Sequence, residues 1–352
     1  NFQDYTVLDV EKTIDYVMRE RIQRENRDPL WLIFFGGEPL LRLDMIRYTI
    51  QYMKEKYPEE KVGYSITTNG TILNEEIVQL FKNEQFSVLV SIDGPDNEFN
   101  LRKDAAGNSS FERVMKFVEA MKENGINTEL RATLVNTNPY LVETFDFFEK
   151  LQLPFFVSFA YASENKAHNY SQYDQEVLQN IRRQFDVLQE YYIHRIRNKE
   201  LIMNQRFYQY GNVLRFRTNK NISCGAGRTY FTITAGGDIY ACAHYMNTPS
   251  RAIGNINAGP EIDPSDYKAL EIDSIGECAS CWAKYLCLGL CVAQKVTLGK
   301  GNATASLANE CELERIQLAF YLKLFYYAQT LAPYLYFKKD AKLEDEPKRV
   351  EL

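Results

Sequence analysis

Cysteine is the residue type in this sequence that points most directly to chemistry, because all of its copies lie in one stretch. The chain has 352 residues, and no cysteine precedes Cys224. The start of the chain shows no signal-peptide pattern, and without one a dense cysteine cluster favours a metal site over disulfide bonds. The seven cysteines are Cys224, Cys242, Cys278, Cys281, Cys287, Cys291 and Cys311.

The spacing of these cysteines leaves two kinds of metal site open. Zinc takes closed four-ligand sites, usually built from two Cys-x2-Cys pairs or with His. Only Cys278 and Cys281 form such a pair, so a second zinc would need His244 or a carboxylate as its fourth ligand. Iron–sulfur clusters bind through Cys thiolates. The spacing alone therefore favours iron–sulfur clusters, with zinc as the first alternative and disulfides or free thiols as the second.

The elements that must position a site are clearest in the first part of the chain, where short apolar runs alternate with helical patterns. Five runs rich in β-branched or aromatic residues are separated by apolar residues at helical spacing. Such alternation predicts right-handed β-α-β units and a parallel α/β sheet, with ligands at the carboxyl ends of the strands. The strand candidates are Trp31–Phe35, Val62–Thr67, Ser87–Ile92, Thr128–Val135 and Phe155–Tyr161.

The remaining elements are a helical region, a hairpin and C-terminal helices. Apolar residues at helical spacing predict a helical region from about Gln172 to Asn204. The turn Gly236-Gly237-Asp238 between two short apolar runs predicts a β-hairpin. Two apolar helical stretches, Ile316–Phe325 and Tyr326–Tyr336, follow the last cysteine.

The cysteine pattern is similar to that of a known domain. Cys-x12-Gly-x4-Cys, Cys-x2-Cys-x5-Cys-x3-Cys and a final Cys resemble the seven-cysteine SPASM domain of radical S-adenosylmethionine (SAM) peptide-modifying enzymes. Three flanking segments resemble those of thioether-forming maturases of the sactipeptide and ranthipeptide type. These segments are Cys224-Gly225-Ala226-Gly227, Gly237-Asp238-Ile239-Tyr240-Ala241-Cys242 and Cys281-Trp282-Ala283-Lys284.

The resemblance implies two auxiliary [4Fe–4S] clusters. The first would be held by Cys224, Cys242 and Cys291, with one iron left open. Related sulfatase-maturing enzymes carry an eighth cysteine that fills this position, and this sequence has only seven. The second cluster would be fully ligated, by Cys278, Cys281, Cys287 and Cys311.

A second resemblance lies in the alternating part of the chain. Gly36-Gly37-Glu38-Pro39 follows the strand candidate Trp31–Phe35 and resembles the GGEP motif that binds the amino group of SAM in radical SAM enzymes. The chemistry is reasonable, because glycines let backbone carbonyls approach an ammonium and Glu38 supplies a compensating charge. The family's fold is a (β/α)6 barrel, so the resemblance implies a partial barrel here.

Further positions match the radical SAM pattern. The resemblance implies cofactor contacts from Thr68 and Asn69 in a TNG turn, from Ser91 to the ribose, and from Arg131 to the SAM carboxylate. A structural ion pair is the alternative role for Arg131. Asp93, in the segment Ser91-Ile92-Asp93-Gly94-Pro95, would contact substrate as a catalytic residue or cap its own turn. Arg102 and Lys103 follow this segment at a place where relatives carry a basic residue, and a solvated loop charge is their alternative role. His168 and His194 carry no catalytic pattern of their own.

The largest departure from the family is at the start of the sequence. Radical SAM enzymes hold their catalytic cluster with Cys-x3-Cys-x2-Cys after the first barrel strand, and neither this motif nor that strand occurs here. We therefore expect an upstream segment that carries both, and with it a third [4Fe–4S] cluster. The expected organisation is a partial radical SAM barrel over 1–165, a helical bridge over 166–220, a SPASM domain over 221–337 and a charged tail over 338–352.

The function that the resemblance implies is that of a radical SAM enzyme that forms Cys-to-carbon thioether crosslinks in a ribosomally synthesised, Cys-containing precursor peptide. A 5′-deoxyadenosyl radical would abstract a hydrogen from the acceptor residue, and a substrate thiolate on the open cluster would form the bond. An electron donor such as flavodoxin or ferredoxin is expected. Epimerisation, C–C crosslinking and formylglycine formation are alternatives, and the absent eighth cysteine counts against the last. A non-catalytic, metal-binding peptide scaffold is an alternative of another class.

Composition excludes several other classes of protein. Hydrophobic residues make up 45% and charged residues 25% of the chain, which is typical of globular proteins. The 41 Lys and Arg against 47 Asp and Glu give a net charge of −6, without the basic excess of nucleic-acid binders. No apolar run approaches the ~20 residues that span a bilayer. We therefore expect a cytoplasmic protein with neither nucleic acid nor membrane as its partner.

Overall fold

The computed structural model describes most of the chain. The tail over 338–352 and His168 lie outside the described residues. In the part described, no helix is both long and apolar enough to cross a membrane. The described residues are 6–23, 28–104, 106–137, 139–160, 173–216, 224–246, 248–260, 271–299, 307–332 and 336.

A five-stranded parallel sheet forms the first half of the molecule, with its strands in sequence order. All five predicted strands are confirmed, and their bounds differ from the expected ones by one or two residues. Tyr161, the expected end of the last strand, lies outside the described residues. The strands are β1 (Leu30–Phe34), β2 (Val62–Thr68), β3 (Ser87–Ser91), β4 (Asn127–Leu134) and β5 (Phe155–Phe159).

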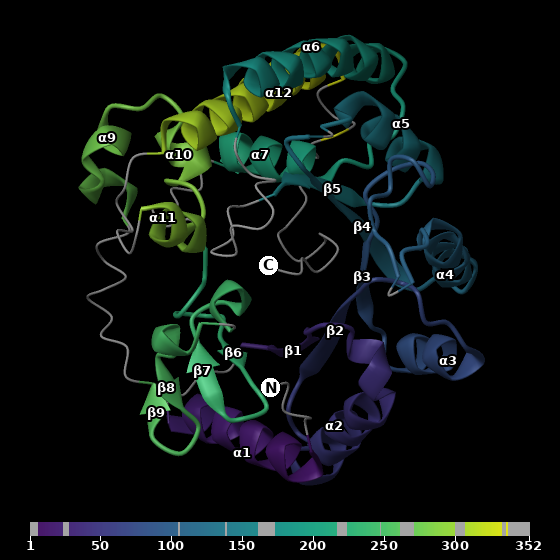
Figure 1. Ribbon diagram of the computed structural model, residues 1–352, viewed down its shortest axis with the longest axis vertical. Coiled ribbons are helices and arrows are strands. Elements are labelled where there is room, and N and C mark those ends of the chain that lie inside the picture. Colours follow the sequence, from purple (N-terminus) through teal and green to yellow (C-terminus); the bar gives the residue numbers. More distant parts are fainter. Residues whose placement is uncertain are drawn as a thin grey trace.

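Helices cover the outer face of this sheet: those that connect successive strands lie on the right-hand side of Figure 1, and the one that precedes β1 lies at the bottom. The helical spacing of their apolar residues explains this cover: in the helix between β3 and β4, Val114, Phe117 and Met121 are completely buried against the strands. One helix precedes β1 and the others connect successive strands. They are α1 (Val7–Gln23), η1 (Pro39–Arg42), α2 (Leu43–Lys56), α3 (Glu75–Asn83), α4 (Phe111–Glu123) and α5 (Leu141–Leu151).

Side chains along β4 alternate between the face that packs against the helices and the opposite face, where the candidate site lies. Leu130, Ala132 and Leu134 are buried against the helices, whereas Glu129 and Arg131 lie on the opposite face and are half-buried. In a parallel sheet the carboxyl ends of the strands share one edge, so the loops after β1, β2 and β3 converge there.

Three helices pack together next to β5, at the top of Figure 1: α6 (Gln175–Arg197), α7 (Gln205–Phe216) and α12 (Ala308–Leu331). A buried hydrogen bond of 3.1 Å joins the Asn204 amide to the Tyr321 hydroxyl. The largest apolar core runs from the sheet through α6 and α7 to α12. The helical bridge and the C-terminal helix therefore share a core with the α/β part.

The C-terminal helix differs from the prediction of two stretches. A single helix, α12, begins at Ala308, contains Cys311 and ends at Leu331. It stays unbroken because no Gly or Pro interrupts the sequence between these bounds. Cys311 is thus held on a rigid helix rather than in a loop.

The cysteine-rich region begins with the predicted hairpin, β6 (Thr232–Ile233) and β7 (Asp238–Tyr240), which is confirmed. Gly237 at its turn has a φ of +80°, which favours glycine. Two strands that the sequence did not predict, β8 (Gly254–Asn255) and β9 (Gly259–Pro260), extend it to a four-stranded antiparallel sheet.

The small sheet packs against the first helix of the chain. Tyr16 of α1 forms a buried cluster with Ile239 and Ile256. The cysteine-rich region therefore contacts the first helix of the α/β part, and the elements form a ring (Figure 1). Short helices continue the cysteine-rich region, and one of them, Lys284–Cys287, contacts α12. They are η2 (Ala243–Tyr245), η3 (Pro249–Arg251), η4 (Ile272–Ser274), α9 (Gly276–Ala279), α10 (Lys284–Cys287) and α11 (Val292–Leu298).

Candidate functional site

The Glu38 carboxylate joins the loop after β1 to the loop after β2. One carboxylate oxygen accepts hydrogen bonds from the Leu40 backbone N–H at 3.1 Å and from the Thr68 hydroxyl at 2.8 Å. The other accepts the Asn69 backbone N–H at 2.8 Å. Glu38 thus starts η1 as its N-cap and fixes the next loop at the same time. The structure thus brings together three residues predicted to bind SAM, Glu38, Thr68 and Asn69. The Glu38 carboxylate accepts hydrogen bonds from the protein itself, at the edge of the sheet where the strands end.

The turn after β2 is held by its own side chains. The Asn69 side-chain oxygen accepts from the Thr71 backbone N–H at 2.9 Å and from the Thr71 hydroxyl at 2.6 Å. Thr68 is buried, and its hydroxyl also accepts the Gly70 N–H at 3.0 Å. These bonds give Thr68 and Asn69 a role in shaping the loop.

Space for a ligand remains beside the two glycines before Glu38. A Cβ atom added at Gly36 or Gly37 would meet no atom within 4 Å. Pro39 begins η1 directly after Glu38. An open backbone next to a held carboxylate is an arrangement that suits a ligand ammonium.

Ser91 and Arg131 lie side by side at the same sheet edge. They are register partners on β3 and β4. His244, just after Cys242, approaches them from the cysteine-rich region: burial lowers the pKa of its ring, and the nearby Arg131 charge lowers it further. The ring of elements therefore places η2 opposite the carboxyl ends of the strands.

Asp93 is buried in a network of structural contacts. Its carboxylate forms an ion pair with Arg102 at 2.9 Å and accepts the Thr133 backbone N–H at 2.9 Å. Its own backbone N–H donates to the Asn100 side chain at 3.1 Å. These contacts join the segment after β3 to β4 and to Arg102, which gives the Asp93 carboxylate a structural role, and its catalytic role stays a prediction. Arg102, the possible basic contact after this segment, is thereby engaged within the protein.

We expect Asp93→Asn to act on stability more than on ligand binding. The substitution removes the negative charge that Arg102 faces, and breaking such a partly buried charged hydrogen bond costs about 1.5–3 kcal/mol. Urea unfolding should show the lower midpoint, while the Kd for SAM stays close to that of the unchanged chain. Loss of peptide modification with unchanged stability and an unchanged Kd for SAM would favour the catalytic role instead.

The cysteines form two groups. Burial raises the pKa of Cys291, and the nearby Cys242 and Cys224 raise it as well, so these three thiols lie close together. They come from different segments: Cys242 precedes η2, Cys291 caps α11, and Cys224 precedes the small sheet. All seven cysteines are free thiols, so none forms a disulfide.

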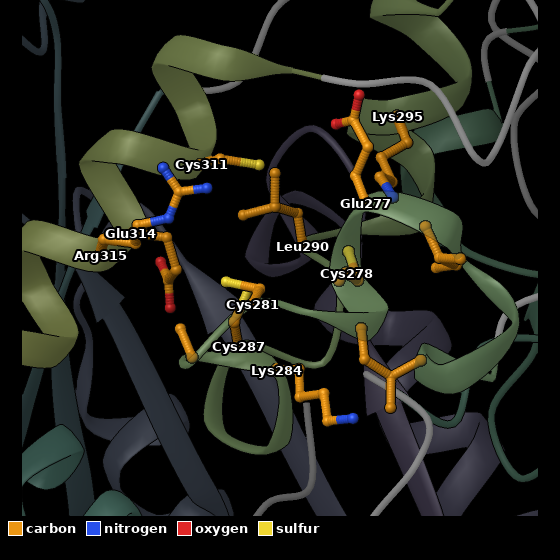
Figure 2. A pocket seen from close by; sticks show the side chains of 14 residues that line it. Glu277, Cys278, Cys281, Lys284, Cys287, Leu290, Lys295, Cys311, Glu314 and Arg315 are labelled. Carbon is orange, nitrogen blue, oxygen red and sulfur yellow. The ribbon is translucent and has the colours of Figure 1, made fainter.

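The other four cysteines line one pocket between α9, α10 and α12 (Figure 2). Burial raises the pKa of Cys287 to about 12. Arg315 donates a hydrogen bond to Cys281, which raises the pKa of the guanidinium. The four cysteines that line the pocket are Cys278, Cys281, Cys287 and Cys311.

The distances between these four cysteines differ from those expected of a site for a single metal ion. Among the described residues, no three His, Cys, Asp or Glu converge closely enough to hold one metal ion. A zinc site would draw its sulfur atoms to about 2.3 Å from one centre. Thiols spread around a pocket fit a larger inorganic group better than a zinc ion.

Two cationic residues at this pocket were absent from the sequence prediction. Lys295 and Arg315 both line it. Each lies four residues after a cysteine, Cys291 or Cys311, and therefore on the same helix face. That i, i+4 spacing is the signal that could have identified them. His194, by contrast, is exposed on α6 beside Asn198, far along the chain from either cysteine group.

Glu129 is a further residue that the sequence prediction missed. It lies on the inner face of β4 two residues before Arg131, and burial raises its pKa from 4.5 to about 7, while the Arg131 charge acts in the opposite direction. Its position on the site face of an alternating strand was the available signal.

We expect Glu129→Gln to stabilise the protein at high pH. The folded chain keeps a proton on Glu129 up to about pH 7, whereas the unfolded chain loses it near 4.5. The free energy of unfolding therefore falls as the pH rises between these values. The variant lacks this loss and should gain on the order of 2 kcal/mol at pH 8, with a smaller gain at pH 5. Urea unfolding at both pH values tests this, and an equal gain at both would contradict it.

Comparison with known proteins defines the class of the α/β part. Residues 4–150 match the family model described as Radical SAM superfamily. The matched residues include β1 to β4 of the parallel sheet, and β5 follows them.

Two relatives extend the similarity beyond those residues. The chain is 27% identical over 298 residues to a cysteine-type anaerobic sulfatase-maturating enzyme of Clostridium perfringens, which covers 78% of this chain and 77% of that protein. It is 23% identical over 330 residues to the radical SAM cyclopropyl synthase TigE of Paramaledivibacter caminithermalis, covering 88% of this chain and 64% of TigE. The chain thus spans less than two thirds of TigE.

Solved structures share the fold as a whole. Native anSMEcpe with bound AdoMet and Cp18Cys peptide superimposes with a TM-score of 0.76 at 19% identity, covering 93% of this chain and 92% of that one. Streptococcus suis SuiB superimposes with a TM-score of 0.52 at 19% identity, covering 83% and 71%. The cysteine-rich region is therefore part of the shared fold.

Proposed function

We propose that this chain is the SAM-binding and cluster-binding part of a radical SAM enzyme that modifies a ribosomally synthesised peptide, and that it forms Cys-to-carbon thioether crosslinks. The observation that carries the proposal is the division of the seven thiols into a group of three and a pocket of four, in a chain whose residues 4–150 match the radical SAM family model. A peptide substrate is supported by relatives named for sulfatase maturation and by the peptide bound in anSMEcpe.

The residues present fit the groups that this function requires. The four thiols around one pocket would hold a closed [4Fe–4S] cluster, and the set of Cys224, Cys242 and Cys291 would hold a second one with one iron open. The Glu38 loop, Ser91 and Arg131 line the sheet edge where SAM would bind. When bound, SAM and a reduced cluster supply the radical chemistry, and the protein supplies position and exclusion of water.

The set of three cysteines is what favours thioether formation. A fourth position would be free for a substrate thiolate, and metal coordination deprotonates a thiol at neutral pH. Holding that sulfur in place next to the acceptor carbon raises its effective concentration. In balance, one S–H and one C–H bond would be replaced by one S–C bond: the C–H hydrogen atom would pass to the 5′-deoxyadenosyl radical supplied by SAM, the thiol proton to solvent, and the remaining electron to the clusters and from there to the external electron carrier.

Mass spectrometry of a co-expressed, Cys-containing precursor peptide tests the proposal. With the whole gene product, we expect a loss of two hydrogens for each crosslink and cysteines that resist alkylation. Cys291→Ala should abolish the change, whereas Ser280→Ala, an exposed substitution in the same region, should not. An unchanged mass with the natural partner peptide would refute thioether formation.

Formylglycine formation is the second candidate, because the chain is 27% identical over 298 residues to a cysteine-type anaerobic sulfatase-maturating enzyme. The same experiment separates the two products. Formylglycine carries an aldehyde that a hydrazide reagent captures, and its formation replaces sulfur by oxygen in the peptide. A hydrazide-reactive product would favour this candidate over the thioether.

We expect Glu38→Gln to weaken SAM binding at least tenfold. An amide in place of the carboxylate directs N–H groups at the Asn69 N–H or the Thr68 hydroxyl, and it removes the negative charge beside the ligand ammonium. Equilibrium binding of SAM to the cluster-loaded protein measures the effect. Glu76→Gln is the matched control, since Glu76 pairs with Arg47 on an exposed surface. An equal Kd for both variants would contradict a role of Glu38 in binding SAM.

A further inference from the structure

Lys295 is a buried cation at the pocket of four cysteines. It lies in α11, is only 4% exposed and lines the pocket. Among the described residues, its ammonium forms no ion pair with a carboxylate. Burying a charge without a counter-charge is costly, so such lysines usually face a negative group.

The fold places Lys295 between the two cysteine groups. Its backbone N–H donates to the Cys291 carbonyl at 3.0 Å, one helical turn earlier, so α11 starts in the first group and reaches the second. Its charge also reaches Cys311 on α12. Figure 2 shows Lys295 on the opposite side of the pocket from Arg315.

A closed [4Fe–4S] cluster with four thiolates would be the missing negative group. One-electron reduction by an external donor adds one more negative charge to it. A cation in a low-dielectric surrounding stabilises the reduced form more than the oxidised form. Net charge and hydrogen bonds around a cluster are among the factors that set its reduction potential.

We propose that Lys295 is the electrostatic partner of the cluster held by Cys278, Cys281, Cys287 and Cys311, and that it raises the reduction potential of that cluster. This inference rests on the proposed function, because it requires the cluster. Lys295 acts as a positioning and tuning residue and needs no contact with the peptide.

Two neighbouring cations define the comparison. Arg315 also faces the pocket, but its side chain is 40% exposed and forms an ion pair with Glu312 at 3.4 Å. Lys284 lines the same pocket, yet its ammonium is held by Asp273 and by the Ala279 carbonyl, each at 3.0 Å, and points away from the cysteines in Figure 2. Lys284→Met therefore removes the same charge and side chain at the same pocket without uncovering the cysteines.

The experiment is a redox titration of the full chain in a background of Cys224→Ala, Cys242→Ala and Cys291→Ala, which leaves one cluster. Dithionite is the reductant, and electron paramagnetic resonance reports the reduced fraction. Lys295→Met should lower the reduced-to-oxidised ratio at fixed potential at least tenfold, which is about 59 mV for one electron. Lys284→Met should change it less than Lys295→Met does, and Lys295→Arg should preserve it.

Each outcome decides the question. Equal potentials for Lys295→Met and Lys284→Met would overturn the inference while leaving the proposed function intact. If Lys295→Met fails to assemble a cluster but Lys295→Arg assembles one, the positive charge is required to hold the cluster, which supports the electrostatic partnership, and a potential of Lys295→Arg equal to that of the unchanged chain supports the tuning role. If both fail, Lys295 acts through packing and the inference is wrong. Zinc without iron in the unchanged chain would instead refute the proposed function.

Discussion

Cys287→Ala is expected to remove about half of the iron from the reconstituted chain, from about eight atoms to about four. Cys287 lies in the pocket of four cysteines, where burial raises its pKa to about 12. Without it, one iron of the four-cysteine cluster loses its protein ligand. The other cluster site shares no cysteine with this pocket and should stay filled.

The companion variants make the test specific. Cys291→Ala should also remove about half of the iron, and the double variant should remove nearly all of it. Ser280→Ala, an exposed change between two of the pocket cysteines, should remove none. Iron and zinc quantitation under anaerobic conditions measures the result. Two zinc ions and no iron in the unchanged chain would favour the non-catalytic scaffold, and complete iron loss in either single variant would contradict two independent sites.

Loading of these sites should depend on pH. Burial raises the pKa of the thiols of Cys242, Cys287, Cys291 and Cys311, so the metal-free protein carries them protonated at neutral pH. Because thiolate is the form that ligates metal, binding must release these protons. Cluster assembly is therefore expected to become slower and less complete as the pH falls from 8.5 to about 6.5, with proton release measurable in a weakly buffered solution.

The sequence predicted the α/β part well because one physical signal dominates there. Each strand is a short β-branched or aromatic run between strongly amphipathic helices, so both periodicities are visible. The strands β8 and β9 were missed because each has only two residues and includes glycine or proline, which leaves no alternation to detect. The single helix α12 was divided in two because an uninterrupted apolar sequence contains no marker of where a helix continues or ends.

The site was predicted by residue type but not by its contacts. Spacing identified Glu38 and the cysteines, yet nothing local showed that the Glu38 carboxylate accepts from Thr68 and Asn69, some 30 residues later in the chain. The same holds for Asp93, whose ion pair with Arg102 depends on the path of the intervening loop. Long-range pairing and burial decide these roles, and neither is encoded in a short window of sequence.

Glu149→Ala is expected to destabilise the fold by about 3–5 kcal/mol, the cost of breaking a buried charge pair by removing one partner. Glu149 of α5 is completely buried. Its carboxylate accepts the Tyr192 hydroxyl at 2.8 Å and the Met203 backbone N–H at 3.0 Å, and it lies 3.5 Å from Arg195. One side chain thus joins α5, α6 and the segment that leads into α7. Alanine would leave the Tyr192 hydroxyl and the Met203 N–H without this acceptor, and Arg195 would keep only Glu200 as a carboxylate partner among the described residues.

Matched variants separate charge, hydrogen bonding and helix propensity. Tyr192→Phe removes one hydrogen bond and should cost about 1 kcal/mol. Asp146→Ala on the same helix breaks only an exposed pair with Lys150 and should cost less than about 1 kcal/mol. Urea unfolding with unchanged m-values measures all three. Since α6 and α7 pack on α12, which carries Cys311 and Arg315, the Glu149→Ala protein should also lose iron at a lower urea concentration. Iron release at an unchanged urea concentration would show that the cysteine pocket is stabilised independently of this buried pair.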